Sequence, residues 1–215
     1  MEKNSNNVPT NVMEEQAERG NAIAKVNKNV IIACVVVFVA IICGGLVWYF
    51  VHQNNVAKAQ EAIGVADMEM NDSIQAVMYK DIADAGSNAP NQRAKLLTAI
   101  KLYEDGKYQD AIGYLDDASV DSDVITVGIY CLKGDCYVNL KKFDEALGCY
   151  ADALDKAEGN DQLVPYVLLK EANIYREQKN YEKELECYTA IRTDYPMFLS
   201  DVDKYYERAR LAAGK

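Results

Sequence analysis

KKFDEALGCYADAL, from Lys141 to Leu154, has the pattern of an amphipathic helix preceded by a short turn. The chain repeats the pattern upstream as GKYQDAIGYLDDAS, from Gly106 to Ser119, and downstream as KNYEKELECYTAI, from Lys179 to Ile191. The gaps between the copies have room for one further helix each. Repetition of this kind predicts an array of similar structural units, each packed against its neighbours.

The spacing of the copies predicts the type of repeat. Tyr108, Phe143 and Tyr181 occupy equivalent places and lie 35 and 38 residues apart. A period in the mid-thirties with two helices per period is typical of the tetratricopeptide repeat. Because strict apolar alternation is missing, no sheet is expected. The chain is predicted to be all-α, a tetratricopeptide-type α-solenoid of helical hairpins with a C-terminal capping helix. Helices are expected at 73–85, 90–105, 107–118, 123–140, 143–157, 162–178, 181–194 and 198–213.

Small and aromatic residues define the predicted core of the repeats. Gly134 and Ala146 are expected to face each other where the helices of the central hairpin cross, because only small side chains allow a close approach. Pro196 is expected to end the last repeat helix. The predicted repeat core is Tyr108, Ala111, Ala118, Gly134, Tyr137, Phe143, Ala146, Tyr150, Ala153, Tyr175, Tyr181, Tyr188 and Pro196.

Three charged residues depart from the repeat pattern. Lys133 and Glu171 stand where the motif prefers leucine, and Glu184 stands where it prefers alanine, at the close crossing of the third hairpin. An unpaired carboxylate is too costly to bury. The third hairpin is therefore predicted to splay so that Glu184 reaches water. The final polar helix is predicted to shield the last hairpin.

A long apolar segment precedes the repeats. VIIACVVVFVAIICGGLVWYFV, from Val30 to Val51, contains no charged residue and as a helix would span roughly 33 Å, enough for a bilayer core. Arg19, Lys25 and Lys28 precede it and only Lys58 follows closely, so the N-terminus is predicted to be cytoplasmic. The expected organisation is a polar tail (1–28), a transmembrane helix (29–51), a stalk with a degenerate first hairpin (52–89), tetratricopeptide repeats (90–196) and a capping helix (197–215).

Charge and residue types argue against several functions. The 215-residue chain has a net charge of −10, and residues 1–51 are balanced, so residues 52–215 carry all of it. Nucleic acid is therefore not an expected partner. His52 is the only histidine, which argues against a Ser-His-Asp triad or an HExxH site in residues 52–215, the predicted outer domain. The chain is not expected to be an enzyme, and no catalytic residue, metal or cofactor is predicted.

Four cysteines fall in the outer domain: Cys131, Cys136, Cys149 and Cys187. None belongs to a CxxC motif, and Cys149 and Cys187 occupy the same repeat position. This equivalence favours small buried thiols with a packing role. One disulfide or a zinc site remains the alternative.

The inner surface of the solenoid is the predicted binding site. Curved arrays line their concave side with the first helix of each repeat. The positions assigned to it by register are Arg93, Leu96, Ile100, Tyr103, Gly128, Cys131, Asp135, Val138, Tyr166, Leu169, Asn173 and Arg176. This mostly apolar and aromatic set suits segments of other proteins. The alternative is that these side chains only pack against neighbouring helices.

The order of parts, together with the ending DVDKYYERARLAAGK, resembles the YfgM-like proteins of Gram-negative bacteria. The resemblance implies a single-pass protein of the inner membrane with a periplasmic domain, acting as an ancillary or chaperone-like factor beside the Sec translocon. Its partners would be translocon subunits or exported chains. The alternative is a structural adaptor subunit of an envelope complex that does not touch exported chains. Either role rests on analogy.

Overall fold

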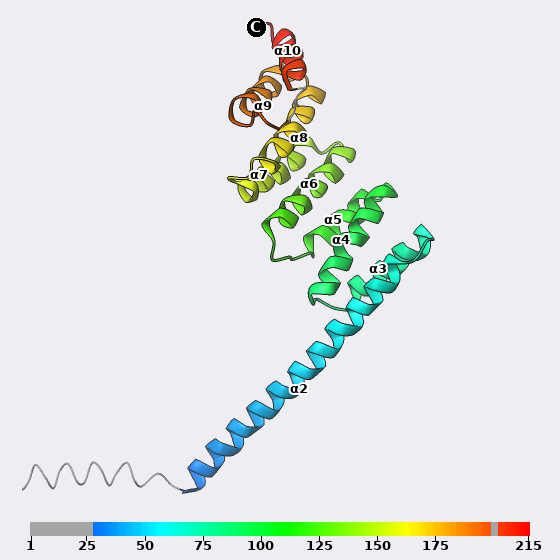
Figure 1. Cartoon of the computed structure of the whole chain (residues 1–215), viewed down its shortest axis with the longest axis vertical. Coiled ribbons are helices and arrows are strands. Elements are labelled where there is room, and N and C mark those ends of the chain that lie inside the picture. Colours follow the sequence, from blue (N-terminus) through cyan, green and yellow to red (C-terminus); the bar gives the residue numbers. More distant parts are fainter. Residues whose placement is uncertain (1–27, 199–201) are drawn as a thin grey trace, which may run out of the picture. The chain divides into compact units, whose positions relative to one another are not determined.

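The computed structural model describes residues 28–198 and 202–215 (Figure 1). The predicted polar tail 1–28, apart from Lys28, lies outside the described residues. Every regular element in these two ranges is an α-helix, which confirms the all-α prediction. The contacts divide the chain into two units, Met1–Asn55 and Val56–Lys215, and each is described by itself.

The apolar segment forms the greater part of α2 (Lys28–Asp67), which is drawn in blue and cyan in Figure 1. This helix is long and apolar enough to cross a membrane, judged by length and composition. The Trp48 ring stacks on the His52 ring, with 5.3 Å between the ring centroids. The helix continues past Val51 to Asp67 without a break, so the predicted stalk extends the apolar helix.

The second unit is a series of antiparallel helical hairpins. After the end of α2 come α3 (Asp72–Asp84), α4 (Ala89–Glu104), α5 (Tyr108–Asp116), α6 (Asp123–Asn139), α7 (Phe143–Ala157), α8 (Leu163–Glu177), α9 (Tyr181–Asp194) and α10 (Val202–Ala212). The hairpins are α4 with α5, α6 with α7, and α8 with α9. The repeat helices begin and end within two residues of the predicted bounds. The last helix begins four residues later than predicted.

Local signals in the sequence explain where the helices begin. The Asn71 side chain accepts hydrogen bonds from the backbone N–H groups of Ser73 and Ile74, both at 3.1 Å, and so caps α3. Asn88 and Asn91 form a capping box at the start of α4, where Pro90 occupies the first turn. Each of these caps satisfies backbone donors that the helix itself leaves unpaired.

The turn inside each hairpin repeats the same backbone conformation. Gly106, Lys141 and Lys179 have φ values of 76°, 61° and 58°, and they occupy equivalent repeat positions. A left-handed residue after a helix ends it and reverses the chain direction. Lysine tolerates this region less well than glycine, so the second and third turns are held in it by the packing of the hairpin.

The crossing of α6 and α7 depends on Gly134. A Cβ added there would lie 2.3 Å from Cε1 of Tyr150, far too close for real atoms. The three atoms nearest to that added Cβ all belong to the Tyr150 ring, which therefore occupies the space beside Gly134 at the crossing. Ala146, Tyr150 and Ala153 are buried in one cluster with Val167 and Ile174 of α8, through which the next hairpin docks.

The predicted core residues differ in depth. Ala111, Gly134, Ala146, Tyr150, Ala153 and Tyr188 are buried; Tyr108, Ala118, Tyr137, Phe143, Tyr175 and Tyr181 are half-buried. Pro196 is exposed, so its assignment to the core is wrong. Because α9 ends at Asp194, Pro196 lies just beyond the helix end. Ala118 lies beyond α5, which ends at Asp116 rather than at 118.

The prediction for Glu184 is wrong. Its side chain is only 1% exposed, so the carboxylate does not reach water. Nη2 of Arg208, on α10, lies 2.7 Å from its Oε1 atom. The prediction treated the carboxylate as unpaired, and the capping helix supplies the partner. Val202 and Ala209 bury the inner face of α10 against the cluster around Leu185 and Tyr188, as expected of a cap.

Candidate protein-binding groove

The first helices of the repeats form one continuous face. Contacts join α4 to α6 and α6 to α8, whereas within the described ranges no Cα pair within 8 Å joins α5 to α7 or α7 to α9. Helices that converge on one side and diverge on the other produce a curved array. The α4–α6–α8 face is therefore the concave side, as the register predicted.

The twelve predicted groove residues have different depths on this face. Arg93, Ile100, Gly128, Tyr166 and Asn173 are exposed; Leu96, Tyr103, Asp135, Val138, Leu169 and Arg176 are half-buried. Cys131 is buried, with 4% of its surface exposed, so it cannot contact a ligand in the groove. Its assignment as an exposed inner position is wrong, because it faces the cluster around Val127 and Tyr150.

Several apolar groove residues also pack within the solenoid. Leu96 and Tyr103 contact the cluster around Ala111, Val138 contacts the cluster around Val127, and Leu169 contacts the cluster around Ala172. Tyr166 and Ile100 are the larger apolar residues of the set that stay open, at 46% and 40% exposed. Most of the apolar groove residues therefore also belong to the packing of the solenoid, and fewer of them face solvent.

A polar cluster on this face joins three helices. Asp135 on α6 accepts a hydrogen bond from the Tyr150 hydroxyl of α7 at 2.6 Å. It also accepts two from the Lys170 ammonium of α8, at 2.7 and 2.9 Å. The Lys170 nitrogen lies 5.0 Å from the centre of the Tyr166 ring, so it contacts the exposed aromatic as well. The cluster links adjacent repeats at the inner surface.

The protonation states in this cluster follow from burial and charge. Burial alone would lower the pKa of Lys170, but the hydrogen bond and the charge of Asp135 outweigh it and raise that pKa. Burial, followed by the charge of Asp135, raises the pKa of the Tyr150 hydroxyl well above its usual range. At neutral pH the lysine is charged and the tyrosine keeps its proton, as their roles as donors require.

Sequence reasoning missed Lys170. Lys170 follows Asp135 by 35 residues, whereas equivalent positions of α6 and α8 are 38 residues apart. Lys170 therefore lies one helical turn before Asn173, the residue equivalent to Asp135. The available signal was an opposite charge one turn away from the equivalent position on the neighbouring inner helix.

A hollow of about 320 Å³ adjoins the Asp135–Lys170 pair. Four predicted groove residues meet in it: Asp135, Val138, Asn173 and Arg176. The remaining eight predicted residues lie outside this hollow. Its other lining residues, which the sequence did not single out as groove positions, are Lys141, Phe143, Tyr150, Lys170, Ile174 and Glu177.

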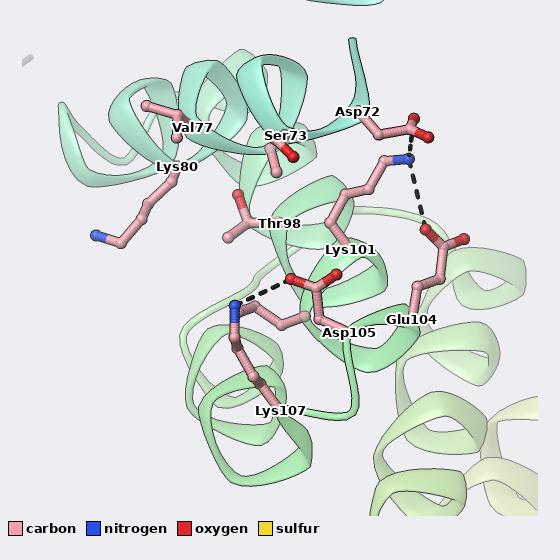
Figure 2. A pocket seen from close by; sticks show the side chains of 11 residues that line it. Asp72, Ser73, Val77, Lys80, Thr98, Lys101, Glu104, Asp105 and Lys107 are labelled. Carbon is pink, nitrogen blue, oxygen red and sulfur yellow. Dashed lines mark hydrogen bonds and ion pairs between the residues drawn. The ribbon is translucent and has the colours of Figure 1, made fainter.

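A larger hollow, of about 470 Å³, lies between α3 and the α4–α5 turn. Figure 2 shows the Lys101 ammonium between the carboxylates of Asp72 and Glu104, and the Lys107 ammonium directed at Asp105. Its third lysine, Lys80, pairs with Asp84 at 2.8 Å. Because every lysine of this hollow already has a carboxylate partner, it offers a ligand no unpaired cation.

The four cysteines of the repeat helices are buried as free thiols. Burial raises the pKa of Cys131 and Cys136 to about 11 and that of Cys187 to about 12. Burial also raises the pKa of Cys149. Buried, protonated thiols behave as small apolar side chains. In the described part of the chain no group of His, Cys, Asp or Glu is arranged to hold a metal ion.

Comparison with known proteins gives one similarity of note. The chain is 31% identical over 101 residues to the DnaJ homolog subfamily C member 3 homolog of Dictyostelium discoideum. The matched segment covers 46% of this chain and 19% of that protein, so the chain spans about a fifth of the relative's length. No family model matches the chain. The hairpins and this similarity fit a TPR-like protein.

Proposed function

We propose that this chain is a membrane-anchored scaffold that binds other proteins through its α4–α6–α8 face. The observation that carries the proposal is the curved face itself, with its exposed aromatic Tyr166 beside the hollow at Asp135 and Lys170. Apolar and aromatic side chains beside a few charged groups suit segments of polypeptide. The similarity to a DnaJ homologue supports the same general role. We propose no catalytic activity.

The proposed location is the inner membrane of a Gram-negative cell, with the repeats in the periplasm. The cations before the apolar segment support this orientation, as does the resemblance to YfgM-like proteins. In that place the groove would meet chains leaving the Sec translocon while they are unfolded. Weak contacts of low sequence specificity at Tyr166 and Ile100 would then serve an ancillary or chaperone-like role.

A photo-crosslinking residue at Tyr166 tests the proposal in living cells. Tyr166 is 46% exposed on the concave face, and the matched control is Glu207, which is exposed on α10 away from the groove helices. Both proteins carry the full chain and its anchor. We expect irradiation to join the Tyr166 variant to several secreted precursors and to translocon subunits, and to give few such adducts with the Glu207 variant.

The identity of the adducts decides between the two candidate roles. One constant envelope protein at Tyr166, with no precursors, would support the structural adaptor instead. Equal patterns from the two positions, or no adduct from Tyr166, would mean that the concave face does not bind proteins.

A further inference from the structure

The end of α2 and the helix α3 form a first hairpin, with a hollow of about 430 Å³ on one side. The hollow is lined by Lys58, Glu61, Ala62, Val65, Met78, Asp81 and Ile82. The other side of the hairpin packs on α4, where Ala94 shares a buried cluster with Ile63 and Ala66. Among the described residues, none of α4 lines the hollow. We call this face the first-hairpin edge; it points away from the rest of the solenoid.

Every later hairpin has a helix packed against the corresponding side. The second helix of one hairpin contacts the first helix of the next: α3 contacts α4, α5 contacts α6, and α7 contacts α8. At the other end of the array, α10 covers the last hairpin. In the described part of the chain no helix precedes the first hairpin in this way, although the ends of a repeat array need a cover. The first-hairpin edge is therefore equivalent to an interface between repeats that lacks its second helix.

Apolar side chains are exposed at the first-hairpin edge. Val65 on α2 is 55% exposed and Ile74 on α3 is 50% exposed. Ile74 lies one helical turn before Met78, so the two share a face of α3. Val65 and Met78 line the hollow from opposite helices, and the buried Ile82 lines it as well. The edge therefore offers an apolar groove that a helix with its own apolar stripe can fill.

Charged residues of the edge select the occupant. Lys58, Glu61 and Asp81 are exposed, and none of them forms an ion pair within the described part of the chain. Lys58 on α2 and Asp81 on α3 line the same hollow, so they lie at similar heights along the hairpin. When two such edges meet around a two-fold axis parallel to the helices, these heights are kept. Each Lys58 then faces Asp81 of the partner subunit, and the interface gains two ion pairs.

The anchor favours a second copy of the chain over other occupants. A two-fold axis parallel to α2 keeps the two α2 helices parallel, as the proposed anchoring of both chains in one membrane requires. It also places α3 of each chain antiparallel to α2 of the other, which is the packing of a four-helix bundle. Confinement to one membrane raises the effective concentration of the chains for each other. Repulsion between the two acidic domains is screened beyond about 8 Å at physiological salt.

We propose that two copies of this chain form a dimer through their first-hairpin edges. In this dimer α3 of each copy packs into the hollow beside α2 of the other, and Lys58 of each copy pairs with Asp81 of the partner subunit. Glu61 has no counterpart among the charges of the edge and stays at the solvent-exposed rim. The dimer goes beyond the proposed protein-binding role, because it uses none of the α4–α6–α8 face.

Energy transfer between labelled copies of the full chain in phospholipid vesicles tests the dimer. Donor and acceptor dyes are attached to tags added after Lys215, and the ratio of protein to lipid is varied. We expect transfer above the level of random proximity, and an excess of unlabelled protein should abolish it. Vesicles keep both copies in one membrane, which detergent micelles would not.

Substitutions at the edge locate the contact. K58E should weaken dimerisation about tenfold or more, because both ion pairs become repulsions. I74E should weaken it similarly by placing a charge in the apolar groove. E61Q should strengthen dimerisation, because the unmatched carboxylate is lost. The matched controls on α10 are K204E and L211E, which change an exposed lysine and a leucine that is 69% exposed, and they should have no effect.

A mixture of two variants tests the pairing of Lys58 with Asp81. When the donor copies carry K58E and the acceptor copies carry D81K, each substituted side chain meets an opposite charge in the mixed dimer. Energy transfer should then return to the level of the natural chain. A mixture that associates no better than K58E alone would refute the pairing. Equal melting temperatures will show that the variants are folded.

Other outcomes overturn the dimer itself. Transfer at the random level in the natural chain would mean that no dimer forms. Transfer that survives both K58E and I74E would mean that the copies meet at another surface, such as the apolar segment. A loss with L211E as large as that with I74E would show that the added charge, and not its position, is responsible. Crosslinking at Tyr166 is read independently, so failure of the dimer leaves the proposed scaffold standing.

Discussion

Nη2 of Arg208 lies 2.7 Å from Oε1 of Glu184, although the glutamate side chain is only 1% exposed. The two residues are 24 positions apart and belong to different helices, α10 and α9. Beside them the rings of Tyr188 and Tyr205 stack, with centroids 5.8 Å apart. The capping helix therefore does more than cover the last hairpin. It neutralises a charge that the third repeat places in its core.

Removing the Arg208 side chain should show by how much an unpaired Glu184 carboxylate destabilises the folded protein. R208M leaves Glu184 buried without a partner, which costs up to about 3–5 kcal/mol in a fully buried pair. The cost here should be smaller, because the Arg208 side chain is 45% exposed. Urea denaturation measures the loss. The double variant E184A/R208M should regain part of the stability, and strictly additive losses would contradict the pairing. R210A, which breaks an exposed pair with Glu207 and a hydrogen bond to the Lys215 carbonyl, serves as the control.

Two glycines of α6 provide a matched test of the hairpin crossing. G134A should destabilise the protein by about 1–3 kcal/mol, because its Cβ would collide with the Tyr150 ring. G128A has open space around its Cβ and should be neutral or stabilising by up to about 1 kcal/mol, since alanine favours a helix. Thermal melting distinguishes the two. Equal shifts would show that α6 and α7 do not cross at Gly134.

Glu171 should make stability depend on pH. Burial raises its pKa, while the charge of Lys183 opposes this shift. The folded state therefore holds the proton more tightly than the unfolded chain, whose pKa is about 4.3. The contribution of Glu171 to the free energy of unfolding should fall as the pH rises from the unfolded pKa through the folded pKa. Above the folded pKa this contribution should stay constant. The variant E171Q lacks this loss, so its melting temperature relative to the natural chain should rise between pH 4 and pH 7. A constant or opposite difference would contradict this assignment.

The buried thiols should resist alkylation. With a pKa of about 11, only ~1 in 10,000 of the Cys131 thiols is ionised at pH 7, and burial blocks access as well. We expect slow reaction of Cys131 and Cys187 with iodoacetamide in the folded protein and fast reaction in urea. Mass spectrometry reads each cysteine separately. Rapid reaction of Cys187 without denaturant would show that the third hairpin opens, and a lack of reaction in urea would indicate a disulfide.

The predicted orientation can be tested with protease added to intact spheroplasts. We expect residues 52–215 to be digested and a tag placed before Met1 to be protected, because the cations cluster before the apolar segment. Opening the cells should make the tag accessible too. Survival of the repeat domain with loss of the tag would reverse the orientation.

The sequence by itself determined the repeat, the helices and the identity of the concave face. The expected helices 143–157 and 181–194 coincide with α7 and α9. Such bounds depend on local features: the cap at Asn71, the proline at Pro90 and the turn residues. These features act over a few residues, so they can be recognised in the sequence. The register of the repeat likewise placed α4, α6 and α8 together.

Only the tertiary structure decided which charged side chains form pairs and how deeply each side chain is buried. The partner of Glu184 is on a helix outside the repeat, so the repeat pattern gave no reason to expect it. Asp135 and Lys170 lie 35 residues apart on neighbouring inner helices, but their contact depends on the distance between α6 and α8. Cys131 faces the core rather than the groove, because a small rotation of α6 moves a residue between the two. Helix formation is local, whereas burial and ion pairing depend on the crossing of helices distant in sequence.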